Sequence, residues 1–182
     1  MVDRRKVVVI ASLAIIVIGT LYYFIGSSMR QYVIINDPNL KALVNKSKLP
    51  RISVRTNAIS NGWILRDFTC YGKSMPPAIE WSNYDDAPCY AVIVFDPDAK
   101  IGTFFHLFEI LDKEGRPVEI FYNSAMRKGW FPVCPPKGEV HRYYFVVIAL
   151  DTCKVKGKNL TDFLTEHALA IGYVVGKFGV KG

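Results

Sequence analysis

Two carboxylates stand at the end of a strongly apolar run in the middle of the chain. Residues 91–95 read Ala-Val-Ile-Val-Phe and predict a strand that is buried on both faces. Asp96 and Asp98 follow that run at once, separated only by Pro97. Because a carboxylate accepts hydrogen bonds from imidazole and hydroxyl groups, these acids are candidates for a polar site at the end of the strand.

Two of the three histidines also lie in or beside apolar strand sequence. His106 sits within Phe-Phe-His-Leu-Phe, and His141 opens an apolar run with Tyr143 two residues later on the same face. A polar ring in a protein core costs free energy unless it is paired. Taken singly, each residue is best explained as a satisfied polar group of the core. Taken together, they raise the hypothesis of a binding site.

The strands that would position these residues are indicated by alternation and turn signals. A turn is expected at Asn61-Gly62, with a hairpin-like return after it, and another at residues 113–116. The expected strands are residues 51–59, 89–96, 103–112 and 141–151.

One helix is expected, over residues 160–171. Asn159 is its N-cap, its apolar residues form one stripe, and Gly172 follows its end, before a short final strand. The mostly β pattern with a late helix favours an antiparallel β-sandwich.

The N-terminal region contains a run long enough to cross a membrane. Residues 7–25 carry no charge over 19 positions, which as a helix would span a hydrocarbon layer of about 30 Å. Arg4, Arg5 and Lys6 precede the run, so the positive-inside rule puts the N-terminus in the cytoplasm and the chain from Met29 onward outside. A cleaved signal peptide is the alternative, although its apolar core usually has only about 7–15 residues.

The predicted protein is therefore a single-pass protein of the cell membrane with an extracytoplasmic C-terminal domain. Its parts are a cytoplasmic N-terminus (1–6), a transmembrane anchor (7–25), a stalk or linker (26–50) and one folded domain (51–182).

Charge and cysteine spacing exclude several classes of function. The net charge is +7, of which residues 3–6 supply +2, and the remaining basic residues are scattered without an Arg/Lys block or a nucleic-acid motif. The four cysteines form no Cys-x-x-Cys pair, which argues against zinc. In an exported domain they raise the question of disulfides.

Five stretches of the sequence resemble one known family. They read FTCYGKSMPPAIEW, FDPDA, FFHLF, CPPKGEVHRYYF and ALAIGYVVGKFG, and they lie between residues 68 and 179. In this order and spacing they resemble the phosphatidylethanolamine-binding proteins, also called Raf-kinase-inhibitor-like proteins, in their bacterial and archaeal YbhB/YbcL branch. The resemblance covers about residues 51–182 and implies a Greek-key-like antiparallel β-sandwich. It also implies a small pocket at one end that takes phosphate or a phospho-headgroup.

The resemblance assigns roles to individual residues. Asp96 would orient an imidazole that donates to an anion, Tyr143 would supply a hydroxyl donor, and the backbone N–H at Cys134 could donate as well. Lys100 and the bulky residues 130–133 depart from the family pattern, and that bulk would narrow or cover the pocket. The ligand-binding residues that the resemblance implies are Asp96, Asp98, His106, Cys134, Pro135, Pro136, His141 and Tyr143.

Three functions follow as alternatives. The preferred one is a binding module that acts without a cofactor and without catalysis, as an inhibitor-like regulator of a protease or kinase. An enzyme would need a metal held by the acids and histidines, or Cys134 as a nucleophile, and no Gly-x-Ser-x-Gly or His-Glu-x-x-His motif supports it. An accessory structural subunit of a membrane complex, with a vestigial pocket, is the third.

Strand direction and the resemblance together suggest a disulfide pairing. If Asp96 ends one strand and His141 begins another at the same site, the two strands are antiparallel, so Cys89 and Cys153 lie at the far end. Cys134 lies at the pocket end, where the resemblance also places Cys70. The favoured pairs are Cys70–Cys134 and Cys89–Cys153, and four free buried thiols are the alternative.

Overall fold

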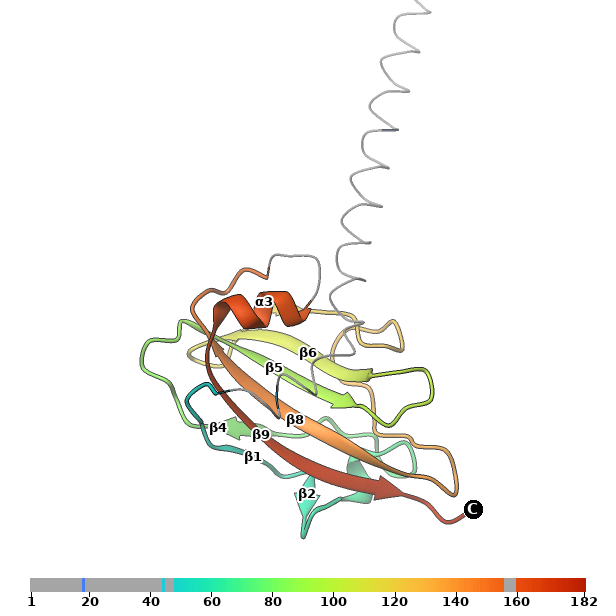
Figure 1. The fold of residues 1–182 in the computed structure, drawn as a ribbon. Coiled ribbons are helices and arrows are strands. Elements are labelled where there is room, and N and C mark those ends of the chain that lie inside the picture. The colour runs from blue at the N-terminus through green and yellow to red at the C-terminus, as the bar shows by residue number, and fades with distance from the viewer. Residues whose placement is uncertain (1–17, 19–43, 45–47, 156–159) are drawn as a thin grey trace, which may run out of the picture.

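A computed structural model describes residues 18, 44, 48–155 and 160–182 (Figure 1). Residues 1–6, the predicted anchor at 7–25 apart from Ile18, and most of the predicted stalk lie outside the described residues. Within the described part of the chain, no helix is long and apolar enough to cross a membrane.

Most of the regular secondary structure in the described chain is β-structure. The helices and strands are β1 (Val54–Thr56), β2 (Ile59–Ser60), β3 (Trp63–Ile64), the 3-10 helix η1 (Arg66–Phe68), β4 (Ile79–Trp81), β5 (Cys89–Asp96), β6 (Phe104–Asp112), β7 (Pro117–Ile120), β8 (Val140–Leu150), α3 (Leu160–His167) and β9 (Ala168–Gly179). Seven strands form one sheet in the order β2-β3-β9-β8-β5-β6-β7, and β1 pairs with β4 in a second, two-stranded sheet. The only parallel pair among these described strands is β3 with β9.

The large sheet is the middle layer of the domain. Figure 1 shows α3 over one face of the curved sheet and the β1–β4 pair on the other side. Alternate residues of β5 and β8 enter two separate cores, one that includes Phe163 and Leu164 of α3 and one that includes Val54 of β1. Every residue of β5 is buried, which confirms the prediction of a strand covered on both faces. The expected sandwich is present in reduced form, because its second sheet has two strands.

The C-terminal helix is shorter than expected, and the strand after it is longer. Residues 168–171 were expected to continue the helix, but they form the start of β9 and pair with the end of β8. The eleven residues of β8 offer backbone partners along their whole length, and these pairings outweigh a local helical pattern. Gly172 does not end the helix. A Cβ there would lie 2.2 Å from the carbonyl oxygen of Ile52, so glycine permits close approach of the two backbones.

The packed domain begins before residue 51. Val44 is fully buried and Leu49 packs against the same core. The carbonyl of Pro50 accepts a hydrogen bond from the N–H of Ile171, and the N–H of Ile52 donates to the carbonyl of Ile171. The end of the predicted stalk therefore lies against the domain.

Two disulfides are present, and they join the cysteines that were predicted to pair. Cys70 is bonded to Cys134 and Cys89 to Cys153, each with a Cα–Cα distance of 5.3 Å. Both predicted pairs are confirmed, and the alternative of four free thiols is wrong for this structure. The strand directions on which the Cys89–Cys153 expectation depended are also confirmed, because β5 and β8 are antiparallel.

Candidate functional site

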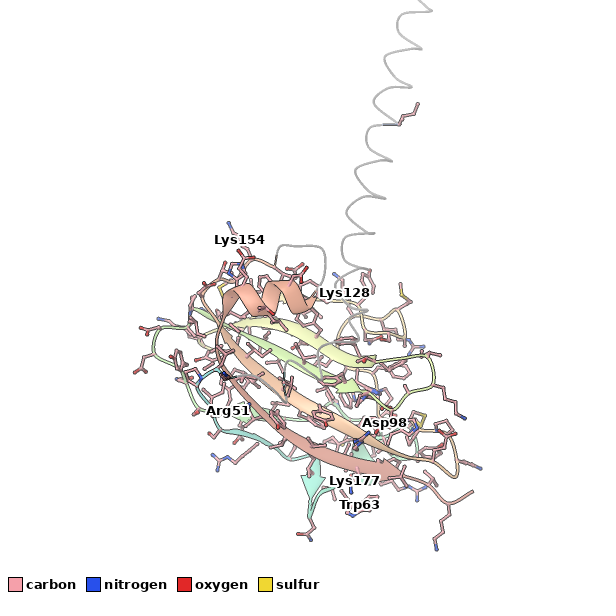
Figure 2. All side chains as sticks on the ribbon, in the orientation of Figure 1. Arg51, Trp63, Asp98, Lys128, Lys154 and Lys177 are labelled. Atoms are coloured by element: carbon pink, nitrogen blue, oxygen red, sulfur yellow. A yellow bond between two sulfur atoms is a disulfide. The ribbon has the colours of Figure 1, made fainter. Side chains whose placement is uncertain are left out.

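The candidate site lies where β5 ends and β8 begins. Because these neighbouring strands are antiparallel, the last residue of β5 and the first residues of β8 meet at one end of the sheet. There the Nδ1 atom of His141 lies 2.7 Å from Oδ2 of Asp96, and both side chains are buried. Figure 2 shows Asp98 and Lys177 at this end of the sheet, while Arg51 and Lys154 lie toward the opposite end.

The two acids that follow β5 are engaged with the protein itself. Oδ1 of Asp96 accepts a hydrogen bond from the N–H of Asp98, and Oδ2 accepts one from His141. Asp98 forms an ion pair with Arg142 and also accepts from the backbone N–H of that residue at 2.9 Å. The carboxylates therefore tie the loop after β5 to the start of β8. A contact between Asp98 and a ligand stays a prediction.

His141 lies between two carboxylates. Its Nδ1 faces Asp96 and its Nε2 lies 3.1 Å from Oε2 of Glu139. Since carboxylate oxygens of ionised acids only accept, both ring nitrogens donate and the ring is an imidazolium. Burial lowers the pKa of His141, but the hydrogen bonds to Asp96 and Glu139 outweigh it and raise that pKa above its ordinary value. Burial also raises the pKa of Asp96, against the hydrogen bond from His141.

Glu139 is a site residue that the sequence interpretation missed. Its other carboxylate oxygen lies 2.6 Å from Nζ of Lys100, the residue that departs from the family pattern. Lys100 and His141 lower the pKa of Glu139. Two-residue spacing from His141 was the available signal, because it puts both side chains on one face of an extended chain. An anion that used Nε2 of His141 would have to displace Glu139, so that expected role of His141 stays a prediction.

A β-bulge aims His106 toward the same end. Phe95 pairs with Phe105 and Val94 pairs with Leu107, so no residue of β5 is paired with His106. The backbone carbonyl freed in this way accepts from the N–H of Phe131 at 2.8 Å, and Nδ1 of the His106 ring lies 2.9 Å from the carbonyl oxygen of Phe131. His106 thus holds the 130–131 segment through both its backbone and its ring.

The His106 ring is neutral. A carbonyl oxygen only accepts, so Nδ1 carries the proton and Nε2 carries a lone pair. Burial lowers the pKa of His106 to about 4, and the carbonyls of Phe131 and Pro132 oppose that shift only in part. His106 is therefore a hydrogen-bond acceptor at Nε2 near neutral pH, and the imidazole that Asp96 orients is that of His141.

Three buried polar atoms, on His106 and on two side chains whose rings lie near it, have no hydrogen-bond partner. Of the side-chain atoms that the structure describes, Nε2 of His106, Nε1 of Trp130 and Oη of Tyr143 are buried and make no hydrogen bond. The His106 ring centroid is 5.4 Å from that of Tyr143 and 6.0 Å from that of Trp130. We call these three side chains the His106 cluster. Buried polar atoms in native proteins are nearly always satisfied by protein groups or by ordered water, so these three atoms stand out.

Tyr143 keeps its proton. Burial and the nearby carboxylate of Asp96 raise the pKa of Tyr143 well above its ordinary value, yet Oη does not meet hydrogen-bond geometry with Asp96. The hydroxyl can therefore donate or accept. Trp130 can only donate, through its indole N–H.

Aromatic side chains cover the cluster, as the bulk of residues 130–133 suggested. The ring centroid of Phe131 lies 6.1 Å from that of His106, and the ring of Phe104 lies 4.8 Å from it. Trp130 and Phe131, two of the residues that depart from the family pattern, therefore lie beside His106.

The Cys134–Pro136 segment is fixed beside the site. Cys134 is bonded to Cys70, and the carbonyl of Pro135 accepts from the hydroxyl of Tyr71 at 2.8 Å. The ligand-binding role that the resemblance gives to Pro135 and Pro136 stays a prediction. Cys134 has no thiol to act as a nucleophile in this structure. Within the described ranges, no group of three His, Cys, Asp or Glu side chains could hold a metal ion.

The sequence is similar to a family of known proteins. The family model described as Phosphatidylethanolamine-binding protein matches residues 55–179. The UPF0098 protein of Pyrococcus horikoshii is 30% identical over 156 residues, which cover 72% of this chain and 79% of the relative. The UPF0098 protein of Methanothermobacter thermautotrophicus is 32% identical and covers 70% of this chain and 98% of its own. LppC of Mycobacterium tuberculosis, which is named as a lipoprotein, is 32% identical over 57% of each chain.

Solved structures show the same fold. YbcL of Escherichia coli, a member of the mammalian PEBP family, matches 72% of this chain and 99% of its own with a TM-score of 0.59 at 23% identity. A phosphatidylethanolamine-binding protein homologue from Chlamydia trachomatis matches 70% of this chain and 97% of its own, with a TM-score of 0.58 at 24% identity. With the family match across nearly the whole described domain, these findings show that the chain belongs to the phosphatidylethanolamine-binding protein family, in its bacterial and archaeal branch.

Proposed function

We propose that this protein is a binding module that holds a phosphate group at the His106 cluster. The observation that carries the proposal is that His106 and two neighbours, whose ring centroids lie 5.4 and 6.0 Å from its own, each bury a polar atom without a partner. A phosphate group has several oxygens on one centre, so it could contact all three side chains at once. The family is named for binding a phospholipid, which agrees with a phosphate-sized ligand.

Affinity for phosphate should be modest because the ionised groups nearby already neutralise one another. The described ion pairs at this end are Asp96 with His141, Asp98 with Arg142, and Glu139 with Lys100. No net positive charge remains among these six groups to attract a dianion. Recognition would therefore depend on hydrogen bonds from uncharged side chains to the anion, which contribute about 1.5–3 kcal/mol each.

Inorganic phosphate should shift the indole N–H resonance of Trp130 in an NMR titration of the full chain in mild detergent. Tyr143→Phe removes one of the three proposed contacts, so the dissociation constant for phosphate should rise about 10- to 100-fold. Tyr173→Phe is the matched control, because it also removes one hydroxyl but lies on β9 and packs against the other core. The Tyr173→Phe variant should bind phosphate as tightly as the unmodified protein does.

Water is the competing occupant in this experiment. A buried water molecule can both donate and accept, so it could satisfy the same three atoms. In that case phosphate would leave the Trp130 resonance in place. All three atoms are shielded from solvent, so phosphate can reach them only if a side chain around the cluster moves. A Trp130 resonance that does not respond to phosphate would remove the proposal.

The membrane anchor is part of the proposed function. The charge-free run at 7–25 and the basic residues before it support a single-pass protein with its β-domain outside the cytoplasm. The relative named as a lipoprotein agrees with attachment to a membrane.

The full chain should stay in the membrane fraction after a carbonate wash. Replacing Ile15 and Ile16 with lysine should release it, because each charge at the centre of a spanning helix costs about 2.5–3.5 kcal/mol. Ile101→Lys is the control, since Ile101 is 81% exposed and its replacement should leave fractionation unchanged. Recovery of a mature chain that starts near Ser27 or Met29 would show a cleaved signal peptide instead.

We propose that the module acts by binding and not by catalysis. Disulfide formation removes the thiol of Cys134, and the neutral ring of His106 is held by Phe131. An extracytoplasmic binding module of this kind could regulate a partner, and the phosphate site would then sense the ligand.

A further inference from the structure

We infer that the His106 cluster selects a phosphate group that carries its own O–H, as in inorganic phosphate or a protonated monoester, over a diester. This inference rests on the proposed phosphate site and names the chemical form that the site takes. It follows from which of the three unpartnered atoms donate and which accept.

The decisive atom is Nε2 of His106. Its ring proton is on Nδ1, because Nδ1 lies 2.9 Å from a carbonyl oxygen that can only accept. Nε2 therefore presents a lone pair, and it is buried without a partner. A bound group satisfies it only if that group brings a hydrogen-bond donor, as water or a protonated oxyanion does.

The other two unpartnered atoms, on Trp130 and Tyr143, can donate hydrogen bonds to a ligand. The indole N–H of Trp130 only donates, and the hydroxyl of Tyr143 can donate to a ligand oxygen. The complete requirement is therefore a ligand with at least one acceptor oxygen for Trp130 and one O–H or N–H for His106. A fully deprotonated oxyanion would leave its own lone pairs facing that of Nε2.

Protonating His106 would remove this requirement, but the surroundings oppose it. Burial and the nearby imidazolium of His141 both lower the pKa of His106. The three carboxylates at this end, Asp96, Asp98 and Glu139, are each paired with a cation. The ring therefore stays an acceptor at neutral pH.

This pattern separates phosphate forms by chemistry. Near pH 7 inorganic phosphate retains an O–H, and a phosphate monoester retains one below its second pKa of about 6. The phosphate inside a phospholipid headgroup is a diester and has no O–H. Sulfate is close to phosphate in size and charge and likewise has none at this pH.

The test compares inorganic phosphate, sulfate and dimethyl phosphate on the full chain in mild detergent at pH 7, following the Trp130 indole N–H by NMR. Phosphate should bind at least about 10-fold more tightly than either of the other two, because an unmet buried acceptor weakens binding by about that factor or more. His106→Asn keeps a donor near the position of Nδ1 and removes Nε2. In that variant phosphate affinity should fall to the level of sulfate, whose affinity should not change.

The outcomes separate the inference from the proposed function. Equal binding of phosphate and sulfate by the unmodified protein would overturn the inference and leave a phosphate site standing. A preference for dimethyl phosphate would overturn it as well and would assign the site to the diester of a lipid headgroup. If His106→Asn loses affinity for phosphate and for sulfate to the same extent, the role of His106 is structural only. If no anion shifts Trp130, the proposed function fails together with the inference.

Discussion

Replacing Cys70 and Cys134 with alanine should lower the free energy of unfolding by about 4 kcal/mol. The two cysteines are 64 residues apart, and closing a loop of that length in the unfolded chain accounts for roughly this amount. The same variant should also bind phosphate more weakly. Cys134 precedes the Pro135-Pro136 segment, and Cys70 donates its backbone N–H to Val133 close to Trp130. Denaturant unfolding and the Trp130 titration measure the two effects.

The other disulfide provides a matched control. Cys89 and Cys153 are also 64 residues apart, so replacing both should cost about the same 4 kcal/mol. They lie at the opposite end of β5 and β8 from Asp96, so phosphate affinity should be unchanged in conditions where the variant is folded. Equal losses of affinity in both double variants would show that the disulfides support the fold in general and not the candidate site.

Much of the fold was predictable because it depends on patterns that are local in sequence. The apolar run in β5 and the turn residues Asn61 and Gly62 each specify their own structure. Asn61 and Gly62 have φ values of 50° and 79°, as a tight hairpin turn requires. Strand direction placed Cys89 and Cys153 at the same end of the sheet, whereas the position of Cys70 near Cys134 came from the family resemblance.

The remaining features depend on contacts between distant segments. Residues 168–171 have a helical pattern, but pairing with β8 extends them. The bulge at His106 follows from the register between β5 and β6, which one strand's sequence does not reveal. The charge of His106 could not be predicted either, because the carbonyl that fixes its tautomer belongs to Phe131, 25 residues away.

The stability of the domain should depend on pH with opposite signs at the two histidines. The pKa of His106 falls from 6.5 to about 4 on folding, so between these values the unfolded state binds more protons. Its contribution is therefore present above pH 6.5 and is lost as the pH falls toward 4. A shift of this size amounts to about 3 kcal/mol.

His141 acts in the other direction. Its pKa is raised on folding by Asp96 and Glu139, so above pH 6.5 the folded state holds its proton more firmly than the unfolded state. The contribution is fully present below pH 6.5 and is lost as the pH rises through the folded pKa. The two histidines together favour greatest stability near pH 6.5.

Single variants isolate the two effects from the carboxylates that titrate in the same range. The stability difference between the unmodified protein and His106→Asn should grow by about 3 kcal/mol in favour of the unmodified protein from pH 4 to pH 7.5. The corresponding difference for His141→Asn should be larger at pH 5 than at pH 9. Denaturant unfolding at these pH values measures both. A difference for His106→Asn that does not change with pH would mean that His106 is not held neutral, and the selection of a protonated phosphate would lose its basis.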